Sequence, residues 1–184
     1  MADLARRPGD GFDPRRNRLL GALPAAAYDR IEPALELMEL PTRMVLSEAR
    51  ALPGWAAFPL EGAISLIAFD ADGDGVEVGA IGAEGAHGIP AILAAAALPI
   101  KAVVQLPGVA VRLPADVVRD EFREDGPFRD LLLRYLAAQF VQTSQSVACN
   151  RLHPLTQRAA RWLLAMHDRV PGDDLPLTHD FLAG

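Results

Sequence analysis

The sequence predicts an α+β protein in which helices flank an antiparallel β-roll of the jelly-roll, or double-stranded β-helix, type. Between residues 37 and 113, short apolar or alternating runs are separated by Gly, Pro and Asp at near-regular intervals, a pattern typical of a compact roll. On both sides of this region the apolar residues follow helical spacing. With 184 residues, 51% of them hydrophobic, the chain is long enough for such a domain to bury a core.

The N-terminal third predicts an arm, two short helices and the beginning of the roll. Residues 1–17 contain Pro and Gly and almost no apolar side chains, so we expect a solvated, disordered arm. From 18 to 36, apolar residues at three- and four-residue steps predict two short helices separated at Pro24. Six strands follow, and the clearest hairpin has its turn at 70–75. The predicted strands are 44–46, 55–58, 63–69, 76–81, 102–106 and 109–113.

Helical spacing returns after the roll. A short helix is predicted over 115–123, and Gly126-Pro127 then introduces a long helix over 128–150. Its wide apolar stripe and few charges favour a homodimer seam, although the helix could instead pack only on its own roll. The side chains expected in the seam are Leu132, Tyr135, Leu136, Gln139 and Thr143.

The last segment, 151–184, predicts the start of a second small domain. An amphipathic helix begins after Pro154 and reaches about residue 170, and Thr178 has the position of an N-cap for another helix. Because the chain stops after barely one turn of that helix, we expect this domain to be incomplete.

Composition and motifs argue against several classes of function. Eighteen basic against 24 acidic residues give a net charge of −6, which disfavours a nonspecific nucleic-acid coat. No apolar run reaches the roughly 18–20 residues that span a bilayer, and the N-terminus lacks a secretory signal, so a cytoplasmic location is expected. The turn at 70–75 matches half of a calcium loop but lacks its final Glu. The histidines and the lone Cys149 have no metal-ligand spacing, and no catalytic motif is present. We expect no enzyme, no catalytic residues and no metal.

The order of these parts resembles the Crp/Fnr family of bacterial transcription regulators over about residues 18–183. The resemblance implies a cyclic-nucleotide-binding-like roll over 18–127, a dimerisation helix over 128–150 and a winged helix-turn-helix DNA-binding domain from 151. The segments that carry it are RLLGALP (18–24), FPLEGAISL (58–66), IGAEGAHG (81–88), CNRLH (149–153), QRAARWLL (157–164) and LPLT (175–178).

The resemblance also implies where ligand and DNA would bind. In the place of the family's ribose-binding Gly-Glu pair stand Gly88 and Ile89, and its phosphate-binding Arg falls near Lys101. A buried phosphate needs a fixed cation and N–H donors, so a cyclic nucleotide is disfavoured and no cofactor is predicted. The candidate ligand residues are Gly82, Glu84, Gly85, Gly88, Ile89 and Lys101, and those in the non-recognition part of the DNA-binding domain are Arg158, Arg161, Thr178 and His179.

These observations predict the sensory and dimerisation part of a homodimeric, DNA-binding transcriptional regulator. Its partner in the full-length form would be operator DNA, but the recognition helix that reads bases in this family has no counterpart in the sequence. Two alternatives stay open. One is a truncated partner that forms dimers without binding DNA, and the other is a stand-alone small-molecule-binding module.

Overall fold

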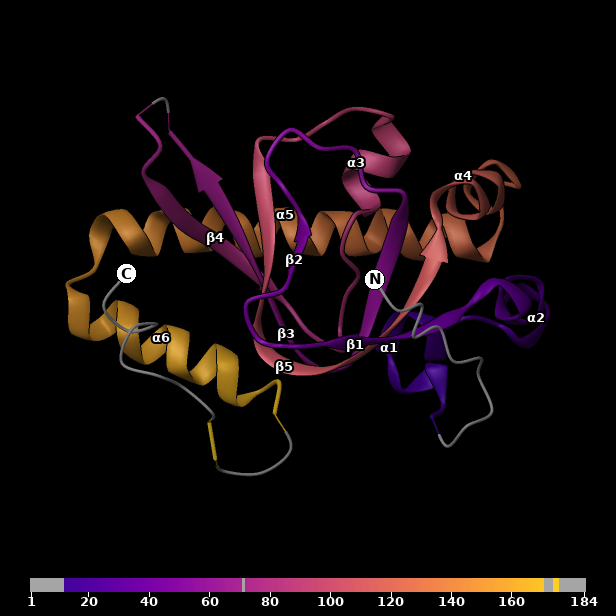
Figure 1. Cartoon of the computed structure of the whole chain (residues 1–184), viewed down its shortest axis with the longest axis horizontal. Helices are drawn as coiled ribbons and strands as arrows, with labels where there is room; N and C mark the ends of the chain where they lie inside the picture. Colours follow the sequence, from indigo (N-terminus) through magenta and orange to yellow (C-terminus); the bar gives the residue numbers. More distant parts are fainter. Residues whose placement is uncertain (1–11, 71, 171–173, 176–184) are drawn as a thin grey trace.

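The computed structural model describes residues 12–70, 72–170 and 174–175, and in this part of the chain five strands form one antiparallel sheet that curls into a roll (Figure 1). The strand order is β1-β5-β3-β4, and β2 also pairs with β5. The predicted antiparallel roll with flanking helices is thus confirmed. The strands are β1 (Glu36–Leu40), β2 (Val45–Ser47), β3 (Trp55–Phe69), β4 (Gly75–Ile81) and β5 (Ile100–Pro114).

The two long strands, β3 and β5, form the centre of the roll and bend together. Their pairing shifts register three times between Pro59 and Ile64. Gly62 has a φ of +87°, and a Cβ on Gly108 would lie 2.2 Å from the carbonyl oxygen of Glu61. A side chain fits neither position, so both bends need glycine. Gly and Pro at these bends predicted strand ends, and the prediction of two short strands in place of each long one was wrong.

The hairpin between β3 and β4 confirms the predicted turn. Asp70 accepts hydrogen bonds on Oδ1 from the backbone N–H groups of Asp72 and Asp74, at 3.0 and 2.9 Å. The first carboxylate of the calcium-like motif therefore caps the turn, as an Asx side chain commonly does. Among the described residues, no group of three or more His, Cys, Asp and Glu side chains is arranged to hold a metal.

Residues 12–17 are folded, so the expectation of a disordered arm was wrong for them. A short 3₁₀ helix spans Pro14–Arg16, and the side chain of Asn17 is wholly buried. Residues 1–11 of the predicted arm lie outside the described part of the chain. The composition of this segment did not predict its folding, because its tertiary hydrogen bonds come from polar side chains, those of Arg16 and Asn17.

The helices agree with the sequence prediction except for α3 (Ile89–Ala94), which was not predicted. The main core lies between the N-terminal helices, the roll, α3, α4 and the first turns of α5, and Phe58 and Phe128 are among its fully buried side chains. In Figure 1, α5 passes behind the whole roll and α6 runs below it. None of the described helices is long and apolar enough to cross a membrane. The helices are α1 (Arg18–Gly21), α2 (Ala25–Ile31), α3 (Ile89–Ala94), α4 (Ala115–Arg123), α5 (Pro127–Leu152) and α6 (Leu155–His167), with a 3₁₀ turn at Glu32–Ala34.

Candidate functional site

A cavity of about 320 Å³ lies between the roll, α3 and α5. Strands β3, β4 and β5 contribute Leu66, Val78 and Ile100, and α5 contributes Leu136 and Phe140. No Arg, Lys, Asp or Glu occurs among the described residues that line it. Such a lining suits an apolar molecule and offers no counter-charge to a phosphate.

His87 is the one titratable side chain among the described lining residues. Its backbone is held by two hydrogen bonds with Ala57: the His87 N–H donates to the Ala57 carbonyl at 2.8 Å, and the Ala57 N–H donates back at 3.1 Å. The side chain is 6% exposed, and its buried Nε2 atom has no hydrogen-bond partner. Burial lowers the pKa of His87 to about 4, because loss of hydration disfavours the charged ring, so the imidazole is neutral at pH 7.

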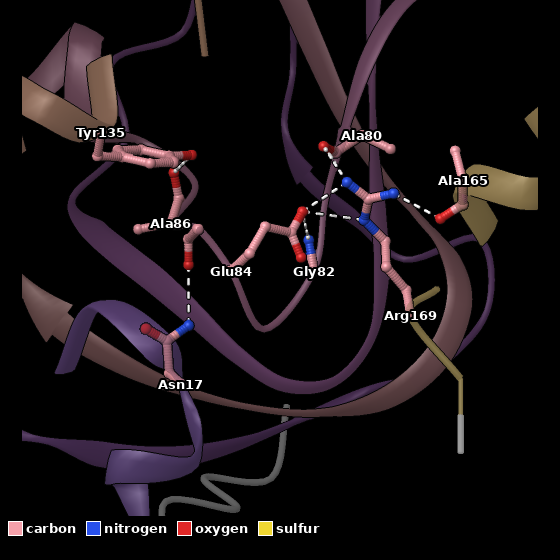
Figure 2. A network of polar contacts seen from close by, with 9 residues as sticks. Asn17, Ala80, Gly82, Glu84, Ala86, Tyr135, Ala165 and Arg169 are labelled. Carbon is pink, nitrogen blue, oxygen red and sulfur yellow. Dashed lines mark hydrogen bonds and ion pairs between the residues drawn. The ribbon is translucent and has the colours of Figure 1, made fainter. Parts of the chain in front are cut away.

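The loop between β4 and α3 contains four of the predicted ligand residues, and contacts within the chain occupy the part around Gly82, Glu84 and Gly85 (Figure 2). Glu84 accepts hydrogen bonds on Oε1 from the Gly82 N–H and from Arg169 Nε, both at 3.0 Å. Arg169 also donates to the carbonyls of Ala80 and Ala165. The charge of Glu84 is therefore neutralised by a residue that follows α6.

Two glycines let neighbouring side chains approach this loop closely. A Cβ on Gly82 would lie 2.7 Å from Arg169 Cγ, and one on Gly85 would lie 2.8 Å from the Tyr135 hydroxyl oxygen. Tyr135 donates its hydroxyl hydrogen to the Ala86 carbonyl at 2.8 Å, and burial raises the pKa of Tyr135. The glycine-rich character of the loop is therefore explained by packing against α5 and the end of α6.

Asn17 holds the same loop from the N-terminal side. Its Nδ2 donates to the carbonyls of Pro59 and Gly85, both at 2.9 Å, and its Oδ1 accepts from the N–H groups of Leu19 and Leu20. The loop is thus fixed from three directions, by the cap of α1, by α5 and by Arg169.

The structure does not bring the six predicted ligand residues together. Among them, only Gly88 lines the cavity. Ile89 is fully buried in the main core, and Lys101 points to Glu48, with Nζ 3.2 Å from Oε2. Gly82, Glu84 and Gly85 make the contacts described above. The cavity was not predicted because six separate stretches of the sequence build it, and because His87, like the other histidines, has no metal-ligand spacing that would single it out.

The residues predicted for the dimer seam lie on the side of α5 that faces the roll, and apart from the buried Leu132 their place in a seam stays a prediction. Leu132 is 1% exposed in the main core, and Tyr135 bonds to the loop. Leu136, Gln139 and Thr143 line the cavity. Leu132 is buried by its own chain, whereas the other four side chains are half-buried and keep some exposed surface.

A different face of α5 is exposed and apolar. Leu133, Phe140 and Val147 follow each other at seven-residue steps and are 46%, 74% and 54% exposed. Seven-residue spacing keeps side chains on one face of a helix and is the repeat of helix pairs that wind around each other.

Helix α6 packs against the roll. Met166 is fully buried with Ala63, Ala80 and Leu106, and Trp162 donates from Nε1 to Glu77 Oε2 at 3.3 Å. Burial raises the pKa of Glu77, while hydrogen bonds from Ser65 and Trp162 act in the opposite direction.

The residues predicted for the DNA-binding part divide into two pairs. Arg158 and Arg161 lie on α6, and the Nε atom of each is buried without a hydrogen-bond partner. Arg161 also donates from Nη1 to Ser146 Oγ at 3.3 Å, which links α6 to α5. Thr178 and His179, with the helix expected around them, lie outside the described residues.

Comparison with known proteins shows similarity in structure alone. The sequence matches no protein-family model and no curated protein. The c-di-GMP-responsive global regulator CLP of Xanthomonas campestris superposes with a TM-score of 0.66 at 15% identity, over 87% of this chain and 83% of that one. A protein from Eubacterium rectale attributed to the Crp/Fnr family of transcriptional regulators gives 0.70 at 13%, over 91% and 79%. A cyclic nucleotide-binding domain from Methylobacillus flagellatus gives 0.63 at 14%, over 77% and 85%. The chain therefore has the jelly-roll fold of cyclic-nucleotide-binding domains and of Crp/Fnr-family regulators.

Proposed function

We propose that this chain is the sensory and dimerisation part of a Crp/Fnr-like transcriptional regulator, with a DNA-binding domain that begins at about residue 151. The observation that carries the proposal is the position of α5. One face of this helix closes the cavity in the roll, and the adjoining part of its surface presents an exposed apolar stripe. Because α5 contacts the cavity and also carries the exposed stripe, a change in the cavity can alter the position of the stripe.

The stripe on α5 favours a homodimer in which the α5 helices of two copies pair. Leu133, Phe140 and Val147 lie along a helix of 26 residues, and a second copy would remove all three from water. A contiguous exposed apolar face of this kind is typical of an association site.

The sensory step would be a shift in population between two arrangements of α5. Phe140 is both a lining residue of the cavity and an exposed member of the stripe, so a molecule in the cavity would favour one arrangement of the helix pair. Arg169 and Trp162 hold α6 on the roll, so the position of the DNA-binding domain would follow that of the roll and α5.

The chemistry of the cavity disfavours a cyclic nucleotide as the signal. A buried phosphate needs a cation with N–H donors in fixed geometry, and the described lining residues provide no Arg or Lys. Lys101 pairs with Glu48 instead of lining the cavity.

The dimer can be tested by sedimentation velocity. The wild-type chain should sediment as a dimer at micromolar concentration, and Phe140→Glu should be a monomer with an unchanged circular dichroism spectrum. Leu164→Glu is the matched control, because Leu164 is 66% exposed but lies on α6, and this variant should stay dimeric. A monomeric wild type, or a dimeric Phe140→Glu, would contradict the seam.

The DNA-binding role can be tested in the cells of origin. DNA cross-linked to the tagged native protein should be enriched in sites with two inverted half-sites about one helical turn, or roughly 34 Å, apart. Phe140→Glu should lose this enrichment. A dimer without enriched DNA would contradict the DNA-binding role and support the alternative of a partner subunit that does not read DNA.

A further inference from the structure

The cavity combines an apolar lining with one buried, unpartnered nitrogen. Leu66, Val78 and Ile100 belong to the lining, and the few polar side chains on it, apart from His87, are uncharged. His87 Nε2 has no hydrogen-bond partner although the ring is 6% exposed. Buried polar groups in proteins are nearly always hydrogen-bonded, so an unpartnered nitrogen in a residue that lines the cavity points to a missing partner.

We propose that the cavity binds a small, uncharged, mainly apolar molecule carrying one hydroxyl group, of the class of alkylphenols, and that the His87 ring forms a hydrogen bond with that hydroxyl. This inference rests on the proposed function, because it names the class of signal that the sensory part would detect.

A hydroxyl group fits His87 better than other polar groups. In a neutral imidazole one ring nitrogen carries a proton and donates a hydrogen bond, and the other nitrogen accepts a hydrogen bond. A hydroxyl group can both donate and accept a hydrogen bond. It therefore satisfies the ring in either tautomer. A carbonyl could bond only to a protonated nitrogen.

A charged ligand does not fit. A carboxylate or phosphate would lose its hydration in the cavity and meet no cation among the described lining residues. It could gain a counter-charge only by protonating His87, and burial lowers the pKa of that ring to about 4. The ligand is therefore neutral at pH 7.

The size of the cavity limits the apolar part. A volume of about 320 Å³ lies at the lower end of the roughly 300–1,000 Å³ typical of small-molecule sites. A single aromatic ring with a short alkyl chain is a suitable size, and Phe140 and Leu136 on α5 provide apolar surface for it.

Three probes that differ at one group test the proposal: 4-ethylphenol, ethylbenzene and 4-ethylbenzoate. Each is titrated calorimetrically into the full chain, the His87→Phe variant and the cavity-filling Ala91→Phe variant, with circular dichroism to verify folding. In the wild type, 4-ethylphenol should bind about fivefold to tenfold more tightly than ethylbenzene, as expected for one hydrogen bond, and 4-ethylbenzoate should not bind. His87→Phe should bind 4-ethylphenol no more tightly than ethylbenzene, because the hydroxyl then lacks its partner, and Ala91→Phe should bind neither.

Several outcomes would overturn the proposal. Equal affinity of the wild type for 4-ethylphenol and ethylbenzene would exclude the role of His87, and tighter binding of 4-ethylbenzoate or of cyclic AMP would exclude a neutral ligand. If no probe binds the folded wild type, the cavity is not a site for this class. Sedimentation of the same samples tests the dimer of the proposed function independently of ligand binding. A stable dimer that binds no probe contradicts the proposed ligand class but not the proposed function.

Discussion

Arg169 and Glu84 lie 85 residues apart in the sequence and form a charged contact that joins the end of α6 to the loop between β4 and α3. The side chain of Arg169 is 8% exposed and that of Glu84 is 37% exposed. The cation is thus the more deeply buried partner, and it depends on the carboxylate for its charge balance.

Removing the charge of Glu84 should destabilise the fold. Glu84→Gln leaves a nearly buried guanidinium without a counter-charge, so we expect the free energy of unfolding to fall by about 1–3 kcal/mol, less than for a fully buried pair. Urea unfolding measures this loss. The control is Glu61→Gln, since the Arg16–Glu61 pair is 48% and 36% exposed and should contribute less than about 1 kcal/mol. Equal losses in the two variants would show that Arg169 does not need Glu84.

A methyl group on Gly85 should also destabilise the chain. In Gly85→Ala the new Cβ would lie 2.8 Å from the Tyr135 hydroxyl oxygen, so the loop or α5 must shift, at a cost of about 1–3 kcal/mol. Gly54→Ala is the matched control, because nothing lies within 4 Å of its Cβ position, and its effect should stay within about 0.5 kcal/mol. Thermal and urea unfolding of both variants test the prediction, which fails if Gly85→Ala is as stable as wild type.

Replacing Asn17 with the isosteric Asp should lower the free energy of unfolding. Asn17→Asp keeps the acceptor that caps α1 but replaces the amide donor with a carboxylate oxygen facing the carbonyls of Pro59 and Gly85. We expect a loss of about 2–4 kcal/mol, because two carbonyls lose their donor and a charge is buried. Asn17→Ser, which also caps a helix but brings no charge, should lose less. If Asp is tolerated better than Ser, capping alone explains the role of Asn17.

The stability of the chain should depend on the titration of His87. Its pKa in the folded protein, about 4, lies below its ordinary value of 6.5, so the unfolded chain takes up the proton first as the pH falls. The contribution of the neutral His87 ring to the free energy of unfolding is complete above pH 6.5. It is lost as the pH falls from 6.5 to about 4, and the total loss is on the order of 3 kcal/mol.

The measurement compares the unfolding free energies of wild type and His87→Phe at several pH values. The difference between them should change across this window. Glu77, whose raised pKa gives the opposite trend, is present in both proteins and cancels. If the unfolding free energies of wild type and His87→Phe change with pH in parallel, the prediction is contradicted.

Most of the secondary structure was predictable, because apolar spacing reports it directly, but β1 and α3 were not predicted. Helix α4 has the predicted bounds, Ala115–Arg123, and α5 extends the predicted helix by one residue at its start and two at its end. The bends in β3 and β5 were not predictable, because Gly62 and Gly108 signal a strand end as readily as a close crossing of two strands.

The site was harder to predict than the fold, for a reason visible on α5. Leu132 and Leu133 are adjacent and equally apolar, yet one is 1% exposed and the other 46%. Apolar residues occur around the whole helix, so their period identifies a helix but not which face packs on the roll. The same ambiguity hid the contact of Leu136 and Gln139, two residues predicted for the seam, with the cavity.

The pairing of β3 with β5 also determines the order in which this protein can fold during synthesis. Trp55, at the start of β3, pairs with Pro114, at the end of β5, so the first half of the longest ladder has no partner until the ribosome has released the whole roll. Until then, β3 with β4 is the one strand pairing of the described sheet that can form, because the other pairings all need β5. Late, long-range pairing of this kind slows folding and leaves an apolar strand open to other chains. The nascent roll is therefore the stage at which this protein most needs a chaperone.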